Sequence, residues 1–253
     1  DDGRLPALAN QSLAGNQSFL VKEEDLAEED DKGGERQYRD AIALIKARGY
    51  ERLGLMTSWA WYDDPKRLAF MFARYKFVSK MLAGARHVLE LGCGDGIGAR
   101  IVRQSVGAVT AVDFDRDFIQ SAREVASDRW PVTFLVHDLL SGPVPGRFDG
   151  IYSLDVLEHI DPAREDSFIE NLLASLDPHG VVVLGMPSLA SQAYASAHSK
   201  IGHANCKDQP EFKGLMLKYF HNVFMFSMND EVVHTGYHAM SHYNLALCVG
   251  RKA

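Results

Sequence analysis

The stretch from residue 87 to residue 186 alternates regularly between short apolar runs of strand type and helical patterns. The strand-type runs are residues 87–91, 108–113, 132–137, 148–154 and 181–186. Regular alternation of this kind predicts a parallel sheet with helices on both faces, because each parallel strand needs a crossover connection to the next. Two later runs, residues 222–228 and 243–250, have no convincing helix between them, so an antiparallel pair at one sheet edge is expected. The chain is therefore predicted to be an α/β protein.

The formal net charge of −7 belongs almost entirely to the N-terminal segment. Residues 1–36 hold 10 acidic and 4 basic residues, whereas residues 37–253 hold 24 and 23. Residues 1–36 are expected to form an acidic, flexible tail, with a partner-binding arm anchored by residues 19–21 as the alternative. Helical spacing of apolar residues predicts an N-terminal helical cap over residues 37–84, ahead of a main domain at residues 85–253.

The cap contains two predicted helices, residues 35–48 and residues 65–84. Trp59 and Trp61 lie between them, and either pack the cap against the main domain or line a pocket for a substrate. Arg74 belongs to the second helix and is expected at the solvated surface, with contact to an anionic substrate as the alternative. The sequence does not decide between these alternatives.

Composition excludes several classes of protein. No run of about 18 apolar residues is present, so no membrane span is expected. No basic segment followed by an apolar one is visible, so no signal peptide is expected. Cys93, Cys206 and Cys248 lie far apart without a C-x-x-C spacing, which favours a reduced, cytoplasmic setting. Residues 37–253 show no basic excess, so a nucleic-acid partner is not expected.

An apolar strand runs directly into a glycine-rich turn in the sequence VLELGCGDGIG, residues 88–98. Such a turn lets a ligand approach the backbone at the carboxyl end of a parallel strand. The part from Gly94 to Ala99 matches the dinucleotide fingerprint G-x-G-x-x-G/A, so a nicotinamide-dependent oxidoreductase is one interpretation. Glu90 and Asp95 would repel a pyrophosphate, however, and would attract a ligand with ammonium and sulfonium groups. S-adenosylmethionine carries both groups.

Five motifs occur in order along the same part of the chain. They are ELGCGDG (residues 90–96), AVDF (111–114), HDL (137–139), FDGIYSLDVLEH (148–159) and LDPHG (176–180). Together they resemble the motifs of the class I S-adenosylmethionine-dependent methyltransferases, with His179 at a position where glycine is commoner. The resemblance implies a Rossmann-like, seven-stranded, mostly parallel sheet with an antiparallel last strand. It also implies S-adenosyl-L-methionine as cofactor and S-adenosyl-L-homocysteine as product.

The resemblance further implies a set of cofactor contacts. The Asp113 carboxylate is expected to hold both ribose hydroxyls, and Asp138 to meet the adenine amino group. The implied cofactor-binding residues are Glu90, Gly92, Cys93, Gly94, Gly96, Asp113, Phe114, Asp138, Leu139 and Leu154. Taken singly, Asp113 is also consistent with a helix cap and Asp138 with a turn. Their shared position after successive strands favours the cofactor site.

Asp155, Glu158 and His159 follow the fourth strand-type run, where a methyl acceptor is expected to approach. An oxygen acceptor must lose its proton, so His159 is the first candidate for the general base and His203 the second. The segment is similar to the Glu-x-x-Glu-His segment of quinone-pathway O-methyltransferases, which is associated with a divalent metal. Asp155, with a shorter reach, replaces the first glutamate, so no metal ligand is predicted here. The alternatives are that His159 packs against the sheet and that Glu158 faces solvent.

These observations predict a cytoplasmic methyltransferase that acts on a small-molecule acceptor, with oxygen favoured as the acceptor atom. A sugar, a quinone or another secondary metabolite is the candidate acceptor. Two alternatives stay open: an NAD-dependent oxidoreductase on a related sheet, and a non-catalytic S-adenosylmethionine-binding scaffold whose acidic tail carries the function. The predicted partners include neither nucleic acid nor a membrane, and a homodimer is left open.

Overall fold

The computed structural model describes residues 35–252, without the side chains of His198 and Ser199. The predicted acidic tail therefore lies outside the described residues, except for its last two. Contacts divide the chain into two units, Asp1–Glu51 and Arg52–Ala253. The second predicted cap helix thus belongs to the same unit as the sheet.

The described part of the first unit is a short helix. A 3-10 turn, η2 (Arg36–Tyr38), leads into α1 (Arg39–Arg48). The helix ends at Gly49, whose φ of 85° is rare for other residues and whose N–H donates to the Ile45 carbonyl at 2.8 Å. The helix predicted over residues 35–48 is therefore confirmed.

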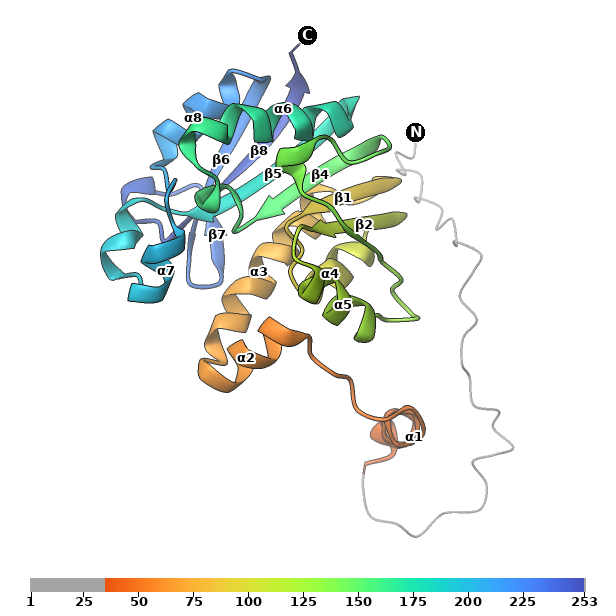
Figure 1. Ribbon diagram of the computed structural model, residues 1–253. Helices are drawn as coiled ribbons and strands as arrows, with labels where there is room; N and C mark the ends of the chain where they lie inside the picture. The colour runs from red at the N-terminus through yellow and green to blue at the C-terminus, as the bar shows by residue number, and fades with distance from the viewer. Residues whose placement is uncertain (1–34, 253) are drawn as a thin grey trace, which may run out of the picture. The chain divides into compact units, whose positions relative to one another are not determined.

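The second unit contains the sheet and the helices that cover it (Figure 1). The strands are β1 (His87–Leu91), β2 (Ala108–Asp113), β3 (Thr133–Val136), β4 (Phe148–Leu154), β5 (Leu176–Pro187), β6 (Phe220–Asn229), β7 (Val232–His234) and β8 (Tyr243–Arg251). The α-helices are α2 (Leu55–Asp63), α3 (Lys66–Met81), α4 (Ala99–Arg103), α5 (Arg116–Glu124), α6 (Glu165–Ser175), α7 (Ala197–Gly202) and α8 (Gln209–Leu217). The 3-10 segments are η3 (Leu139–Ser141), η4 (Leu157–His159), η5 (Pro162–Arg164), η6 (Ala190–Tyr194) and η7 (His238–Met240).

The strands form one sheet in the order β3-β2-β1-β4-β5-β8-β6-β7. Strands β1 to β5 pair in parallel, whereas β8 is antiparallel to both β5 and β6, and β7 is antiparallel to β6. The predicted mostly parallel sheet with an antiparallel last strand is confirmed. The predicted count of seven strands misses β7, which has three residues and is too short to stand out as a periodic pattern.

Helices cover both faces of the sheet because its central strands are apolar on both sides. One core cluster joins α6 and α8 to the sheet and includes Phe168, Leu172 and Phe212. The other joins α3, α4 and α5 to the opposite face and includes Val78 and Ile119. The sheet is therefore the middle layer of three, as the β/α alternation predicts.

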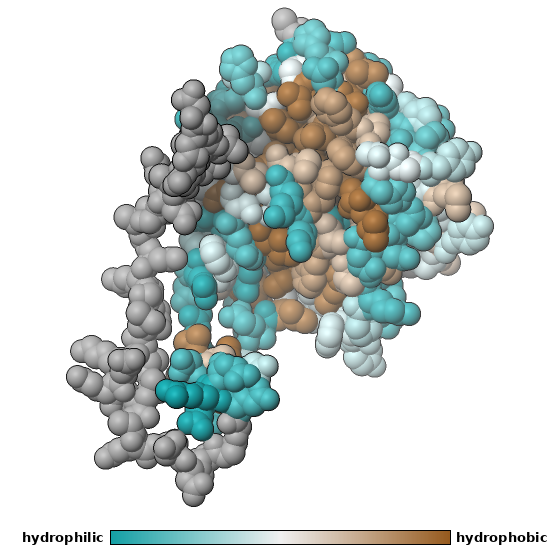
Figure 2. Space-filling model, turned by 180° about the vertical axis from the view of Figure 1, so that it is seen from behind, coloured by the Kyte–Doolittle hydropathy of each residue, from teal (hydrophilic) through white to brown (hydrophobic). Residues whose placement is uncertain are grey.

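Some apolar side chains remain at the surface of the second unit. Figure 2 shows apolar residues in the middle of one face, with hydrophilic residues around them. Among residues 35–252, none of the helices combines the length and the apolar character that crossing a bilayer requires.

The strand register brings three strand ends to one place. Leu91, the last residue of β1, is paired with Val112 of β2 on one side and with Ser153 of β4 on the other. The chain leaves β1 toward β2, while β4 lies on the opposite side, so a crevice opens between the diverging connections. The residues that follow these strands are therefore neighbours.

Candidate active site

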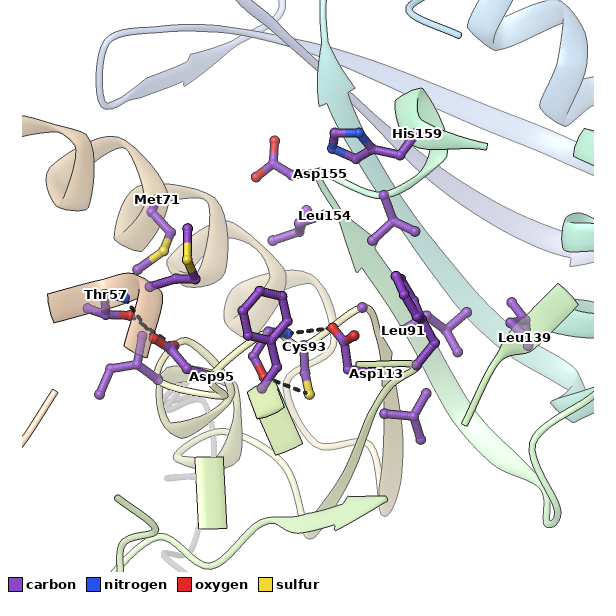
Figure 3. Close-up of a pocket in the computed structure, with 18 of the residues that line it drawn as sticks. Thr57, Met71, Leu91, Cys93, Asp95, Asp113, Leu139, Leu154, Asp155 and His159 are labelled. Atoms are coloured by element: carbon purple, nitrogen blue, oxygen red, sulfur yellow. Dashed lines mark hydrogen bonds between the residues drawn. The ribbon is translucent and has the colours of Figure 1, made fainter. Parts of the chain in front are cut away.

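A cavity of about 850 Å³ opens at the carboxyl ends of β1, β2 and β4. Its size falls within the range of small-molecule sites, and side chains from several elements converge on it (Figure 3). The predicted cofactor-binding residues that line it are Gly92, Cys93, Gly94, Asp113, Phe114, Asp138, Leu139 and Leu154. Glu90 and Gly96 are not part of the lining.

Two glycines of the glycine-rich turn are closely packed against side chains. Gly92 has a φ of 73°, and a Cβ at this position would lie 2.2 Å from the Val156 side chain. Gly96 has a φ of 71° and packs under Phe134, whose ring a Cβ would approach to 2.4 Å. Residues larger than glycine would therefore strain and clash at both positions.

Asp113, at the end of β2, is buried and held by two backbone groups. Its Oδ2 accepts a hydrogen bond from the Gly94 N–H at 2.9 Å (Figure 3). Its Oδ1 accepts one from the Asp115 N–H, also at 2.9 Å. Each carboxylate oxygen has capacity for a further hydrogen bond. The arrangement suits the predicted role of accepting hydrogen bonds from two hydroxyl groups.

The residues after β3 and β2 combine one polar acceptor with apolar surface. Asp138 is exposed, and its Oδ1 accepts a hydrogen bond from the Leu140 N–H at 2.9 Å, which caps η3. Leu139 beside it is buried, while Phe114 is 74% exposed and lines the cavity. An exposed ring and a carboxylate in the lining of one cavity fit a heteroaromatic ligand with an amino group.

Glu90 is fully buried between α3 and the sheet. Its Oε1 accepts a hydrogen bond from the Tyr75 hydroxyl at 2.8 Å, and its Oε2 has no hydrogen-bond partner among the described residues. Burial raises the pKa of Glu90 to about 7; the Tyr75 hydrogen bond opposes this rise, and the Asp113 and Asp95 carboxylates add to it. Its predicted attraction of a cationic ligand stays a prediction.

This buried carboxyl group predicts a pH-dependent difference in stability. From its ordinary pKa of 4.5 up to about pH 7, the folded chain keeps a proton that the unfolded chain releases, so the free energy of unfolding falls as the pH rises. Glu90→Gln keeps a carbonyl oxygen for Tyr75 and removes this titration. The free energy of unfolding in urea should therefore fall between pH 5 and pH 8 by about 2–3 kcal/mol more in the unsubstituted chain than in the variant. If the variant and the unsubstituted chain differed in free energy of unfolding by the same amount at both pH values, the raised pKa would be contradicted.

A contact between α2 and the glycine-rich turn holds α2 beside the cavity. The Asp95 carboxylate accepts hydrogen bonds from the Thr57 N–H at 2.7 Å and from the Thr57 hydroxyl at 2.9 Å, and both residues are buried (Figure 3). Asp95 therefore anchors α2, a role that the sequence alone does not reveal. Met56 and Trp59 of this helix line the cavity, whereas Trp61 does not.

Asp155, directly after β4, has a strained backbone. Its φ is 58°, which is uncommon for a residue other than glycine, and its N–H donates to the Gly185 carbonyl at 3.1 Å and to the Tyr243 hydroxyl at 3.2 Å. Its carboxylate forms a 2.6 Å ion pair with Arg74, whose guanidinium lies 3.8 Å from the centre of the Tyr243 ring. The expectation that Arg74 is a solvated surface residue is therefore wrong.

Glu158 and His159 lie in η4 and not in a longer helix. Glu158 is completely buried, and neither of its carboxylate oxygens has a hydrogen-bond partner among the described residues. Burial, with the Asp155 carboxylate adding to its effect, raises the pKa of Glu158 well above its ordinary value. The alternative that Glu158 faces solvent is wrong. His159 is exposed and lines the cavity beside Asp155 (Figure 3).

His203 reaches His159 from the segment that follows β5. The two ring centres are 5.1 Å apart. The Nδ1 of His159 lies 2.9 Å from the Gly202 carbonyl oxygen, and the Nδ1 of His203 lies 2.8 Å from Oε1 of Gln192. Burial and the neighbouring His159 ring lower the pKa of His203. The structure thus brings the two predicted bases together, although His203 does not line the cavity.

The same residues form a possible set of metal ligands. In the described part of the chain, one group of three such side chains has potential ligand atoms all within 4.8 Å of one another, namely Glu158, His159 and His203. A buried carboxylate without hydrogen-bond partners, next to two imidazoles, fits a divalent cation. Asp155 is not part of this group.

The chain is similar in sequence to known methyltransferases. Residues 88–180 match a family described as methyltransferase domain. The chain is 29% identical over 145 residues to the mitochondrial ubiquinone biosynthesis O-methyltransferase of Arabidopsis thaliana, an overlap of 53% of this chain and 44% of that protein. It is 31% identical over 125 residues to a probable S-adenosylmethionine-dependent methyltransferase of Mycobacterium tuberculosis, an overlap of 47% of this chain and 43% of that protein. The chain spans about half the length of the curated relatives it matches.

Solved structures share the fold. The N-methyltransferase NodS from Bradyrhizobium japonicum WM9, in complex with S-adenosyl-L-homocysteine, aligns with a TM-score of 0.54 at 18% identity over 83% of this chain and 97% of that one. The methyltransferase domain of bacterial CtHen1-C aligns with a TM-score of 0.60 at 18% identity over 72% of this chain and 99% of that one. The family match and the sequence relatives thus identify residues 88–180 as a methyltransferase domain, similar to those of S-adenosylmethionine-dependent methyltransferases.

Proposed function

We propose that this chain transfers a methyl group from S-adenosylmethionine to a hydroxyl oxygen of a small aromatic molecule. The observation that carries the proposal is the position of His159 at the cavity wall beside Asp155. A carbonyl oxygen only accepts hydrogen bonds, so the Nδ1 of His159 donates to the Gly202 carbonyl and the lone pair remains on Nε2. This nitrogen is the proposed proton acceptor.

The lining of the cavity favours an aromatic acceptor over a sugar. Besides the predicted cofactor contacts, it includes the apolar side chains of Met56, Trp59, Met71, Ile160 and Phe168. A sugar would leave several hydroxyl groups without hydrogen bonds against such a surface. The ubiquinone biosynthesis O-methyltransferases among the relatives support oxygen as the acceptor atom. The absence of a basic excess in residues 37–253 supports a small molecule over nucleic acid.

The proposed roles divide between binding and proton transfer. S-adenosylmethionine supplies a methyl group that its positive sulfur already activates. Asp113 binds the ribose hydroxyls, and α2, anchored through Thr57, excludes water from the cavity. The acceptor hydroxyl gives its proton to Nε2 of His159 while its oxygen forms the new bond to the methyl carbon. The electron pair of the broken carbon–sulfur bond stays on sulfur, and His203 is the second candidate for the proton.

The test is methyl transfer from isotope-labelled S-adenosylmethionine to a panel of catechols, phenols, sugars and nucleosides. We expect label in the hydroxylated aromatic compounds, as methyl ethers. Preferential labelling of sugars or nucleosides would contradict the aromatic acceptor. Binding of S-adenosyl-L-homocysteine without methylation of any compound would favour the non-catalytic alternative.

A further inference from the structure

We propose that Arg74 and Tyr243 are positioning residues that hold the Asp155 carboxylate at the cavity wall, where it accepts a hydrogen bond from the methyl acceptor. Asp155 lines the cavity, whereas Arg74 and Tyr243 do not. Both would therefore act on the acceptor through Asp155. The inference rests on the proposed function, because it assigns a further part of the same site to the acceptor.

The backbone of Asp155 gives the first argument. Its φ of 58° lies in the left-handed region, which is unfavourable for a residue other than glycine. Such conformations cluster at functional sites, where the surrounding structure holds them in place. Two groups hold this one, because the Gly185 carbonyl and the Tyr243 hydroxyl accept from the Asp155 N–H at 3.1 Å and 3.2 Å. The residue after β4 is therefore kept in a strained conformation by its neighbours.

The two carboxylate oxygens of Asp155 have different surroundings. Oδ2 pairs with Nη1 of Arg74 at 2.6 Å. Among the described residues, no hydrogen bond is made to Oδ1, and the side chain is 39% exposed. A carboxylate oxygen accepts up to two hydrogen bonds, so Oδ1 is open to a hydroxyl group in the cavity. His159 lies beside Asp155 (Figure 3), so a hydroxyl that reaches Oδ1 is brought toward the proposed proton acceptor.

Arg74 is held by Tyr243 as well as by Asp155. Its guanidinium carbon lies 3.8 Å from the centre of the Tyr243 ring, in a cation–π contact. A planar guanidinium stacked in this way has few orientations, so the carboxylate that pairs with it is oriented too. The Arg74 Nε is buried without a hydrogen-bond partner among the described residues, and loss of the counter-charge as well would be costly. The ion pair is therefore expected to persist.

Tyr243 acts on Asp155 in two ways, through its hydroxyl group and through its ring. It is 2% exposed and begins β8, where it pairs with Pro187 of β5. Gly185 leaves the space for its ring, because a Cβ there would lie 2.7 Å from both Cε1 and the hydroxyl oxygen of Tyr243. An ion pair that only tied α3 to the sheet would need neither this second contact nor the strained backbone. The arrangement thus favours a role in the site over a structural role alone.

The first test compares variants of Arg74 in methyl transfer to the best acceptor of the panel. Arg74→Met removes the charge and keeps a long side chain. Its kcat/KM for the acceptor should fall about 10- to 100-fold, because a shift of about 1 Å in a group that orients a substrate costs this much, while the KM for S-adenosylmethionine is unchanged. Arg74→Lys, which retains the charge, should recover part of the loss.

Two control variants match the substitutions in the proposed positioning residues. Lys76→Met removes an exposed positive charge from the same helix, α3, and should retain the acceptor kinetics. Tyr243→Phe should lower kcat/KM for the acceptor, whereas Tyr219→Phe should not, since that hydroxyl group bonds the exposed Asp166. Binding of S-adenosyl-L-homocysteine by each variant reports that it has folded.

A second measurement, thermal unfolding, needs no acceptor. Asp155→Gly and Asp155→Ala both remove the carboxylate, but glycine adopts a φ of 58° without strain, so Asp155→Gly should have the higher Tm of the two. Arg74→Met should lower the Tm less in an Asp155→Asn background than in the unsubstituted chain, because the ion pair is then already lost.

The outcomes separate this proposal from the proposed function. Acceptor kinetics of Arg74→Met equal to those of Lys76→Met would overturn the positioning role, and so would equal Tm losses from Arg74→Met in the two backgrounds. If the unsubstituted chain bound S-adenosyl-L-homocysteine but methylated no acceptor, the proposed function would fail, and the contact of Asp155 with the acceptor would fail with it. The unfolding data would then still decide whether Arg74 holds Asp155.

Discussion

Replacing Asp113 by alanine is expected to weaken the binding of S-adenosyl-L-homocysteine by about 100-fold. The carboxylate is buried at the end of β2 and oriented by the N–H groups of Gly94 and Asp115, so it cannot move away from the cavity at little cost. Hydrogen bonds to a charged group contribute about 1.5–3 kcal/mol each, and two of them to the ribose hydroxyls exceed the roughly 2.7 kcal/mol that a factor of 100 requires. Isothermal titration calorimetry measures the change directly.

The matched control is Asp117→Ala. Asp117 lies in the first turn of the following helix, is exposed, and does not line the cavity. Removing its charge should leave the affinity nearly unchanged. If Asp113→Ala bound the ligand as tightly as Asp117→Ala, the ribose contact would be misassigned.

The second large effect is expected for His159→Ala. Its ring lines the cavity next to Asp155, away from the Asp113 carboxylate (Figure 3). Proton transfer by a positioned side chain contributes about 10²- to 10⁴-fold to a rate, so turnover should fall by this factor while the affinity for S-adenosyl-L-homocysteine is kept.

Initial rates with labelled S-adenosylmethionine and the best acceptor of the panel measure this effect. His179→Ala serves as the control for removing a histidine, because His179 is exposed and does not line the cavity. Full activity of His159→Ala would remove this residue from the reaction. A parallel loss of cofactor affinity would mean that the variant disturbs cofactor binding instead of proton transfer.

The features predicted from the sequence are local. Strands buried on both faces give continuous apolar runs, so the bounds of β1, β2 and β4 follow from the positions of these runs in the sequence. Gly92 directly follows β1 and Asp113 is the last residue of β2, and parallel pairing then brings them to one sheet edge. Periodicity and turn chemistry therefore sufficed for the sheet and for one side of the cavity.

The features that the sequence left open depend on contacts between distant residues. Thr57 and Asp95 are 38 positions apart, and no spacing rule links them. The sequence contains one indication that Arg74 has a partner. Arg74 is four residues before Val78, so both lie on the same face of α3. Because Val78 is buried, a charge on that face needs a partner, which is Asp155. The isolation of the Glu158 carboxylate follows from tertiary packing alone.

The central claim is that the cavity binds S-adenosylmethionine, and a thermal unfolding experiment with the full chain tests it most directly. At a free ligand concentration 100 times the dissociation constant, binding stabilises the folded state by about 2.7 kcal/mol, which corresponds to a rise in Tm of roughly 5–10 °C for a domain of this size. We predict such a rise with S-adenosyl-L-homocysteine and none with NAD at the same concentration. A rise with NAD and none with S-adenosyl-L-homocysteine would contradict the account.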